Sequence, residues 1–210
     1  MGRFKVKKQD TFIDMTPMSD VMVLLLTFFM LTATFVKEEP VKVNTPGSVS
    51  EVKIPTTNLL TIFVEKNGKV FLSLDSPAAM AKTADQLNTD QKATVIGDVS
   101  TFAQVPMFGT PLNQVNSWLA LEDRNGYLAK NPAAGIPCDS VSDELKVWVT
   151  AASEALGDDK LKIAIKADKH TSYKVIKNVM KSLRDIDKNR YNLITSLAGA
   201  VINRMLWQNK

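Results

Sequence analysis

The stretch MSDVMVLLLTFFMLTATFV, residues 18–36, decides the architecture of this 210-residue chain. Asp20 is its only charged residue, and from Val21 onward its only polar side chains are three threonines. A helix needs about 20 apolar residues to cross the hydrocarbon core of a bilayer. We therefore expect a single transmembrane helix over residues 16–37. A buried helix of a soluble protein is the alternative, but such a helix is rarely apolar on every face.

The charges on the two sides of this stretch differ in sign. Four cations precede it, whereas residues 37–39 read Lys-Glu-Glu; the cations are Arg3, Lys5, Lys7 and Lys8. The positive-inside bias predicts a cytoplasmic tail, residues 1–15, and export of everything after residue 37. A cleaved signal peptide has the same basic-then-apolar order. It fits less well, because Asp20 opens the apolar region and bulky Leu31 lies where a cleavage site needs a small residue.

The composition excludes several classes of protein and of chemistry. Hydrophobic residues at 45% and charged residues at 23% are typical of a folded chain. With Cys138 as its single cysteine, the chain forms no intramolecular disulfide, and with His170 as its single histidine it lacks a metal cluster or a Cys/His pair. The net charge of +4 comes from scattered lysines, so nucleic-acid binding is not expected. We therefore expect that the chain is not an enzyme and that it has no catalytic residue, metal or cofactor.

Residues 58–210 predict one exported domain of the α+β class. Strands are expected at 59–65, 70–74, 162–167 and 191–197, the first two joined by a hairpin at Asn67-Gly68. Helices are expected at 77–87, at 110–121 after Thr110-Pro111, at 139–156 before Gly157, and after Thr171 or Ser172. This ββα…βαβ order predicts helices on one side of a sheet, with residues 88–138 as an inserted elaboration.

Two segments frame the expected membrane helix. Thr16 is expected to cap it and Pro17 to occupy its first position, where proline has no N–H to lose. After the helix, residues 38–57 are rich in proline, glycine and serine, which predicts an extended linker, too irregular for the core, with a short strand at residues 41–43.

Asp20 is the residue with the strongest functional implication. An ionised carboxylate inside a bilayer costs about 2.5–3.5 kcal/mol on insertion scales, so such a residue is usually paired, hydrated or protonated. Asp20, Thr27 and Thr34 lie seven residues apart and form one polar seam of the helix, as expected where it faces other helices. The alternative is that Asp20 lies in the first turn at headgroup level and only complements the helix dipole.

The run from Asp14 to Leu25 resembles the D-x-T-P-x-x-D-V-M-x-x-L-L signature of the ExbD/TolR family. In that family the second aspartate carries the ion, which implies this role for Asp20, with Asp14, Thr16 and Pro17 forming the motif at the start of the helix. Residues 163–169, followed by Tyr173 and residues 175–180, are similar to the strand, A-D-K loop and helix of the family. Where the family often has N-L-P, this chain has Asn44-Thr45-Pro46.

The resemblance implies an ion-driven stator in the inner membrane. The chain would be a homodimer whose two membrane helices lie inside a ring of a polytopic ExbB/TolQ-like partner. Its exported domain would use the proton motive force to act on a TonB-like periplasmic client, with Val43, Asn44 and Pro46 as a linker that contacts partners. The alternatives are a TolR-like subunit, a flagellar MotB-like stator and a plain membrane-anchored binding protein. The transported ion can be H⁺ or Na⁺.

Overall fold

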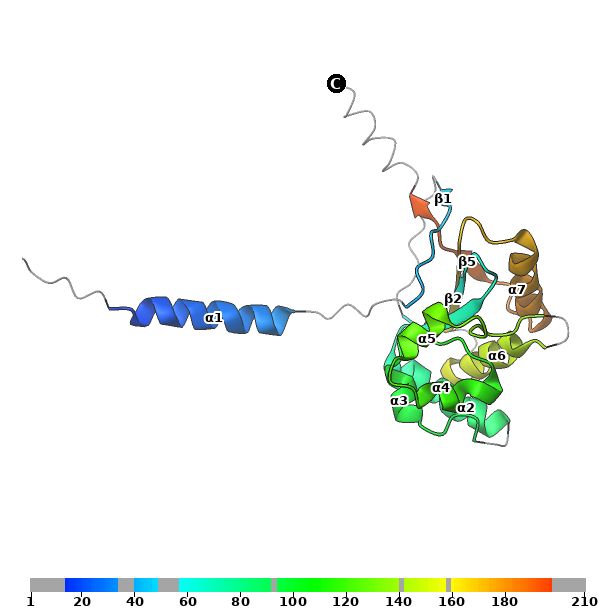
Figure 1. The fold of residues 1–210 in the computed structure, drawn as a ribbon, viewed down its shortest axis with the longest axis horizontal. Helices are drawn as coiled ribbons and strands as arrows, with labels where there is room; N and C mark the ends of the chain where they lie inside the picture. The colour runs from blue at the N-terminus through cyan, green and yellow to red at the C-terminus, as the bar shows by residue number, and fades with distance from the viewer. Residues whose placement is uncertain are drawn as a thin grey trace, which may run out of the picture. The chain divides into compact units, whose positions relative to one another are not determined.

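The protein divides into two compact units, Met1–Lys37 and Glu38–Lys210. The computed structural model describes residues 14–33, 40–48, 57–91, 94–139, 142–157 and 160–197. The helices and strands of these residues are shown in Figure 1. Both units contain regular structure, and among these described residues the buried side chains belong to the second unit.

The first unit contains one helix, α1 (Thr16–Thr32), drawn in blue in Figure 1. None of its residues is buried, and its large apolar side chains are all more than half exposed, from 55% for Val23 to 87% for Leu31. Among the described residues, no helix reaches the combined length and apolarity needed to cross a membrane. Thr34, Phe35 and Val36 of the expected span lie outside the described residues.

The second unit is built on a four-stranded sheet in the order β3-β2-β4-β5. The strands are β2 (Leu59–Val64), β3 (Val70–Leu74), β4 (Lys162–Ala167) and β5 (Tyr191–Leu193). β2 and β3 form the predicted antiparallel hairpin, whereas β4 pairs parallel to both β2 and β5. Gly68 adopts the left-handed conformation, with a φ of 82°. Its N–H donates to the Glu65 carbonyl, and this bond closes the loop of the hairpin.

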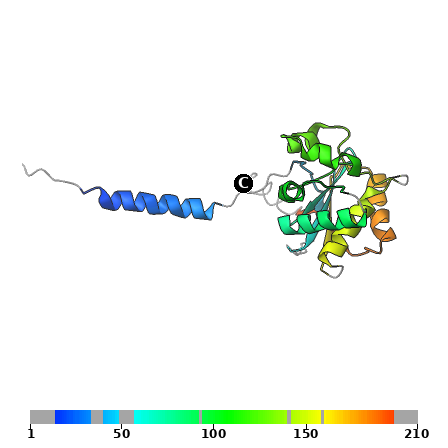
Figure 2. The same ribbon diagram turned by 90° about the horizontal axis from the view of Figure 1, so that it is seen from below.

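The parallel pairs are connected through helices, as parallel pairing requires. α2 (Pro77–Asp90) and α6 (Glu144–Leu156) lie between β2–β3 and β4 in the chain and pack against each other. α7 (Tyr173–Asp185) connects β4 to β5 and packs against α6. Figure 2 shows the strands at the centre of this unit, surrounded by the green helices, the yellow α6 and the orange α7. The mixed α+β class predicted from the sequence is confirmed for this unit.

The insertion closes one edge of the sheet and shares its core. Its helices are α3 (Val99–Gln104), the 3₁₀ turn η1 (Leu112–Gln114), α4 (Val115–Leu119) and α5 (Arg124–Lys130). Phe108 exchanges two backbone hydrogen bonds with Leu72 of β3, and the Ile136 N–H donates to the Val70 carbonyl. Phe102 and Phe108 pack against Trp148 of α6, with ring centroids 5.9 and 4.5 Å apart. Residues of the predicted elaboration, 88–138, therefore contribute aromatic side chains to the core of the domain.

Four details of the predicted elements were wrong. The helix expected from Thr110 begins at Leu112 as a 3₁₀ turn, because Phe108, just before it, pairs with Leu72 of β3. α6 begins at Glu144, not at 139, and a β-bridge between Cys138 and Asp143 directly precedes it. The strand expected over 191–197 is two short strands, β5 and β6 (Ser196–Leu197). Residues 41–43 form no strand; β1 (Gly47–Ser48) comes later.

Candidate functional site

The start of α1 is organised by Asp14. Its Oδ1 accepts hydrogen bonds from the Thr16 hydroxyl at 2.5 Å and from the Thr16 N–H at 3.0 Å. The hydroxyl bond, followed by the backbone bond, lowers the pKa of the Asp14 carboxyl. The predicted cap is therefore wrong: Thr16 is the first helical residue, and the Asp14 carboxylate satisfies its N–H. Pro17 follows in the first turn, where its missing N–H costs no helical bond.

Asp20 lies in the second turn of α1, one turn beyond Thr16. Its neighbours in the chain are exposed apolar side chains, including Met18, Val21 and Val23. A carboxylate at this place in an otherwise apolar helix needs water, a proton or a partner group if the helix enters an apolar phase.

The polar seam predicted along α1 is present only in part in the described residues. Thr27 lies seven residues after Asp20, and its hydroxyl donates to the Leu24 carbonyl of its own helix at 2.9 Å. Such a bond satisfies the hydroxyl without a neighbouring helix. Thr34, the third member of the seam, lies outside the described residues. The seam therefore stays a prediction, and Asp20 is the polar side chain of α1 with the clearest need for a partner.

A second site brings the linker to the loop after β4. The Asn44 N–H donates to Asp168 Oδ2 at 3.0 Å, and the Lys169 N–H donates to the Asn44 carbonyl at 2.8 Å. The other carboxylate oxygen of Asp168 accepts the His170 N–H at 2.9 Å. The bonds from His170 and then Asn44 lower the pKa of the Asp168 carboxyl. Asp168, only 9% exposed, therefore fastens two segments 124 residues apart.

Other contacts extend this attachment along the linker. Val41 is 5% exposed and belongs to the hydrophobic core, and Val43 packs partly buried against that core. The Ser196 N–H donates to the Pro46 carbonyl at 3.0 Å, next to the parallel pair of β1 and β6. The expectation that the linker is too irregular for the core was wrong for Val41. Residues 40–48 are held by the folded domain through the side chains of Val41 and Val43 and through hydrogen bonds of their backbone.

Sequence reasoning missed Asp168 as a site residue. The signal was present, because a carboxylate directly follows the buried strand β4 in the Ala167-Asp168-Lys169 loop. Its partner could not be read from the sequence, since Asn44 contributes its backbone N–H and not its side chain. Of the predicted linker residues, the structure places Asn44 and Pro46 in hydrogen bonds with the domain and Val43 against its core.

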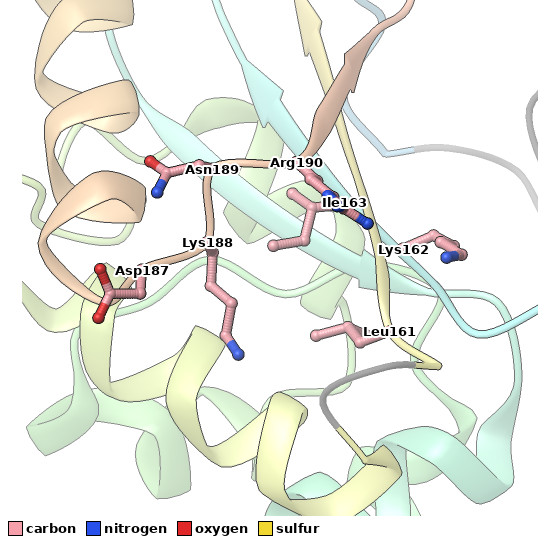
Figure 3. A pocket seen from close by; sticks show the side chains of 7 residues that line it. All are labelled: Leu161, Lys162, Ile163, Asp187, Lys188, Asn189 and Arg190. Carbon is pink, nitrogen blue, oxygen red and sulfur yellow. The ribbon is translucent and has the colours of Figure 1, made fainter.

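The structure also contains a hollow of about 490 Å³ between the start of β4 and the loop after α7 (Figure 3). It is lined by Leu161, Lys162, Ile163, Asp187, Lys188, Asn189 and Arg190. Figure 3 shows Lys162, Lys188 and Asn189 extending in different directions instead of toward one another. Sites for small substrates place a few polar groups around one point, and this hollow does not. Among the described residues, no three His, Cys, Asp or Glu side chains are grouped to hold a metal ion.

The fold and these two sites define a class of protein: an α+β domain tied by a docked linker to an apolar helix that carries one carboxylate. The family model described as "Biopolymer transport protein ExbD/TolR" matches residues 7–107, which include α1, the linker and the β2–β3 hairpin. The signature at Asp14–Leu25 predicted this match, which covers just under half of the chain.

Two curated relatives agree with this family. The chain is 38% identical over 52 residues to "Biopolymer transport protein exbD2" of Vibrio cholerae, which covers 25% of this chain and 39% of the relative. It is 25% identical over 113 residues to "Biopolymer transport protein ExbD" of Aquifex aeolicus, covering 49% of this chain and 86% of that relative. No solved structure matches the chain.

Proposed function

We propose that this chain is an ExbD-like subunit of an inner-membrane, ion-driven motor complex that energises TonB-dependent transport across the outer membrane. One observation carries the proposal: the family match contains a single carboxylate, Asp20, inside an apolar helix. Both relatives are named biopolymer transport proteins, and these names support a role in transport.

In this proposal α1 spans the membrane with residues 1–15 in the cytoplasm, and the domain lies in the periplasm. The apolar side chains exposed on every side of α1 support an apolar environment for the helix. Asp20 takes up and releases a proton at an interface with other helices, because a permanent anion in hydrocarbon is costly. A ring of an ExbB/TolQ-like partner around two copies of α1 would supply that interface.

The linker gives the domain a defined connection to the helix. Residues 40–48 are attached to the domain through Asp168 and Val41. The tether through which movement of α1 would reach the domain is therefore shorter than a free linker of residues 38–57. The domain would pass this movement to a TonB-like client.

The test replaces Asp20 with asparagine in the full chain. Asp20→Asn keeps the size of the side chain and its hydrogen bonding but removes proton exchange, so we expect intact assembly with the polytopic partner and loss of client-dependent uptake. Asp20→Glu should retain more uptake than Asp20→Asn. Asp85→Asn, the same chemical change on an exposed residue of α2, is the matched control and should be normal.

Uptake and co-purification of the partner are measured in cells at matched protein levels. Normal uptake together with normal envelope integrity in the Asp20→Asn strain would overturn the ion-carrying role and leave Asp20 as a residue that complements the helix dipole. If the variant instead impaired envelope integrity and left uptake unchanged, the client would be of the TolR type.

A further inference from the structure

α7 has two faces of opposite character. Val179 and Leu183 are fully buried in the domain, and Ser182 beside them is buried as well. Four cations are exposed on the same helix: Lys174, Lys177, Lys181 and Arg184. At 3.6 residues per turn they fall within roughly 80° of the helix circumference, centred opposite Val179. We call these four residues the basic face.

The charge of the basic face is neutralised in part toward the C-terminal end of α7. Asp185, the acidic residue of α7, pairs with Lys146 of α6 at 2.7 Å and also attracts Lys181 and Arg184. Lys181 shares a hollow with Asp139, Asp143 and Asp185, so Lys174 and Lys177 are the cations with the fewest acidic neighbours. In the part of the chain that the structure describes, no ion pair is recorded for the four cations. With a rise of 1.5 Å per residue, they form a positive line about 15 Å long. Such a line attracts an extended anionic surface.

An aromatic side chain flanks this line. Tyr173, the first residue of α7, is 74% exposed, and on the helix it lies one turn from Lys177. An exposed tyrosine beside lysines is the combination that favours a membrane–water interface, where the ring contacts the headgroup region and the lysine stems cover apolar surface.

We propose that the basic face of α7 docks on the anionic phospholipid surface of the membrane that anchors α1. This inference rests on the proposed function, because the anchor supplies the membrane. A domain held to a membrane by a short linker has an effective concentration near that surface in the millimolar range, so weak electrostatic contacts suffice. Each lysine near an anionic surface strengthens binding severalfold. Docking holds the domain in one orientation until a client displaces it.

The experiment uses the full chain in lipid nanodiscs with or without phosphatidylglycerol. A fluorophore is attached at Ser172→Cys in a Cys138→Ala background, and quenching by headgroup nitroxide lipids reports contact of α7 with the surface. We expect strong quenching only in discs with phosphatidylglycerol, and loss of quenching in high salt. In Lys174→Gln/Lys177→Gln/Lys181→Gln, the ratio of docked to free domain should fall on the order of 100-fold.

A matched control removes three other exposed lysines. Lys66→Gln/Lys82→Gln/Lys130→Gln changes the net charge equally and should leave quenching unchanged. Equal quenching with and without phosphatidylglycerol, or equal loss in both triple variants, would overturn the proposal. So would the binding of a soluble polyglutamate peptide to the basic face in place of the discs. Failure of the membrane anchor gives a different result: the chain would then not co-elute with discs of either composition.

Discussion

α1 and the folded domain use apolar residues in opposite ways. The domain buries them: Trp118, Trp148, Phe102 and Phe108 are each at most 1% exposed. α1 exposes them on all sides, and none of its residues is buried. The domain therefore contains its own stabilising core, whereas α1 exposes the apolar surface that usually marks a binding site for an apolar partner or phase. In the proposed membrane location a polar group would be costly in α1 but not on the surface of the domain, which is why Asp20 carries the functional proposal.

The largest expected effect concerns where each region resides. A phosphatase fused after Lys210 should be fully active in the periplasm, and a reporter that works only in the cytoplasm should be inactive there, because the cations before α1 favour a cytoplasmic N-terminus. The same two reporters fused before Met1 give the reciprocal control. The opposite pattern would reverse the proposed orientation and place the domain in the cytoplasm.

A substitution in each region sharpens the contrast in stability. Trp148→Ala removes a side chain that packs on Phe102 and Phe108, and should lower the free energy of unfolding of the domain by about 3–5 kcal/mol. Urea unfolding of the full chain in detergent, followed by far-UV circular dichroism, measures this loss. Trp148→Phe keeps part of the packing and should lose less.

Leu24→Ala in α1 is the control for this comparison. Leu24 is apolar and 61% exposed, so its loss should leave the unfolding of the domain unchanged. An equal loss of stability in both variants would mean that α1 contributes to the core of the domain.

Local patterns in the sequence predicted most of the fold. The Asn67-Gly68 turn fixed the hairpin, because glycine takes the left-handed conformation that the loop requires. The alternation of Ile163 and Ile165 with lysines gave β4 its bounds. Elements whose bounds depend on distant partners were harder. Thr110 carries a helix-start signal, yet tertiary pairing of Phe108 with β3 holds the chain extended there, and the Thr110 hydroxyl is buried with no partner among the described residues.

The candidate functional residues were predictable where their signal is local in the sequence. Asp20 stands out because a charge inside an apolar stretch is a local anomaly. The attachment of the linker is not local: Asn44 and Asp168 are 124 positions apart and meet through a backbone N–H, which no side-chain pattern encodes. The same holds for Val41, whose burial follows from where the linker is fastened.

A third prediction concerns that attachment. Asp168→Ala leaves the Asn44 and His170 N–H groups without their acceptor, so the linker should detach more often. Trypsin cleavage after exposed Lys42 should become about tenfold faster in this variant. Asp85→Ala, on the surface of α2, should leave the rate unchanged. Unchanged cleavage in Asp168→Ala would show that the core contact of Val41 alone holds the linker.

The same carboxylate predicts a pH dependence. Because the N–H bonds hold the folded pKa of Asp168 below 3.8, its contribution to stability is complete above that pH and is lost as the pH falls through the lower, folded value. The Asn44 and His170 amide resonances in NMR spectra should therefore titrate together, with a midpoint below 3.8. A midpoint at or above 3.8 would contradict the two hydrogen bonds.

The smallest expected effect is that of a reducing agent on the domain. Cys138 is 8% exposed and free, and the aromatic and aliphatic core already holds the domain together. Melting temperatures with and without reductant should therefore agree. Burial, followed by the charges of Asp139 and Asp143, raises the pKa of the Cys138 thiol to about 11, so it should react with a thiol reagent at pH 8 only after unfolding in urea.

The raised pKa also fixes the sign of a weak effect at high pH. As pH rises, the unfolded chain loses the thiol proton first, near 9.0, whereas the folded chain keeps it until about 11. Stability should therefore decline over this interval in the wild-type chain, and Cys138→Ser should lack that part of the decline. A large loss of stability in reductant would instead reveal a bridge between two copies, and the domain would then depend, like α1, on a partner outside its own chain.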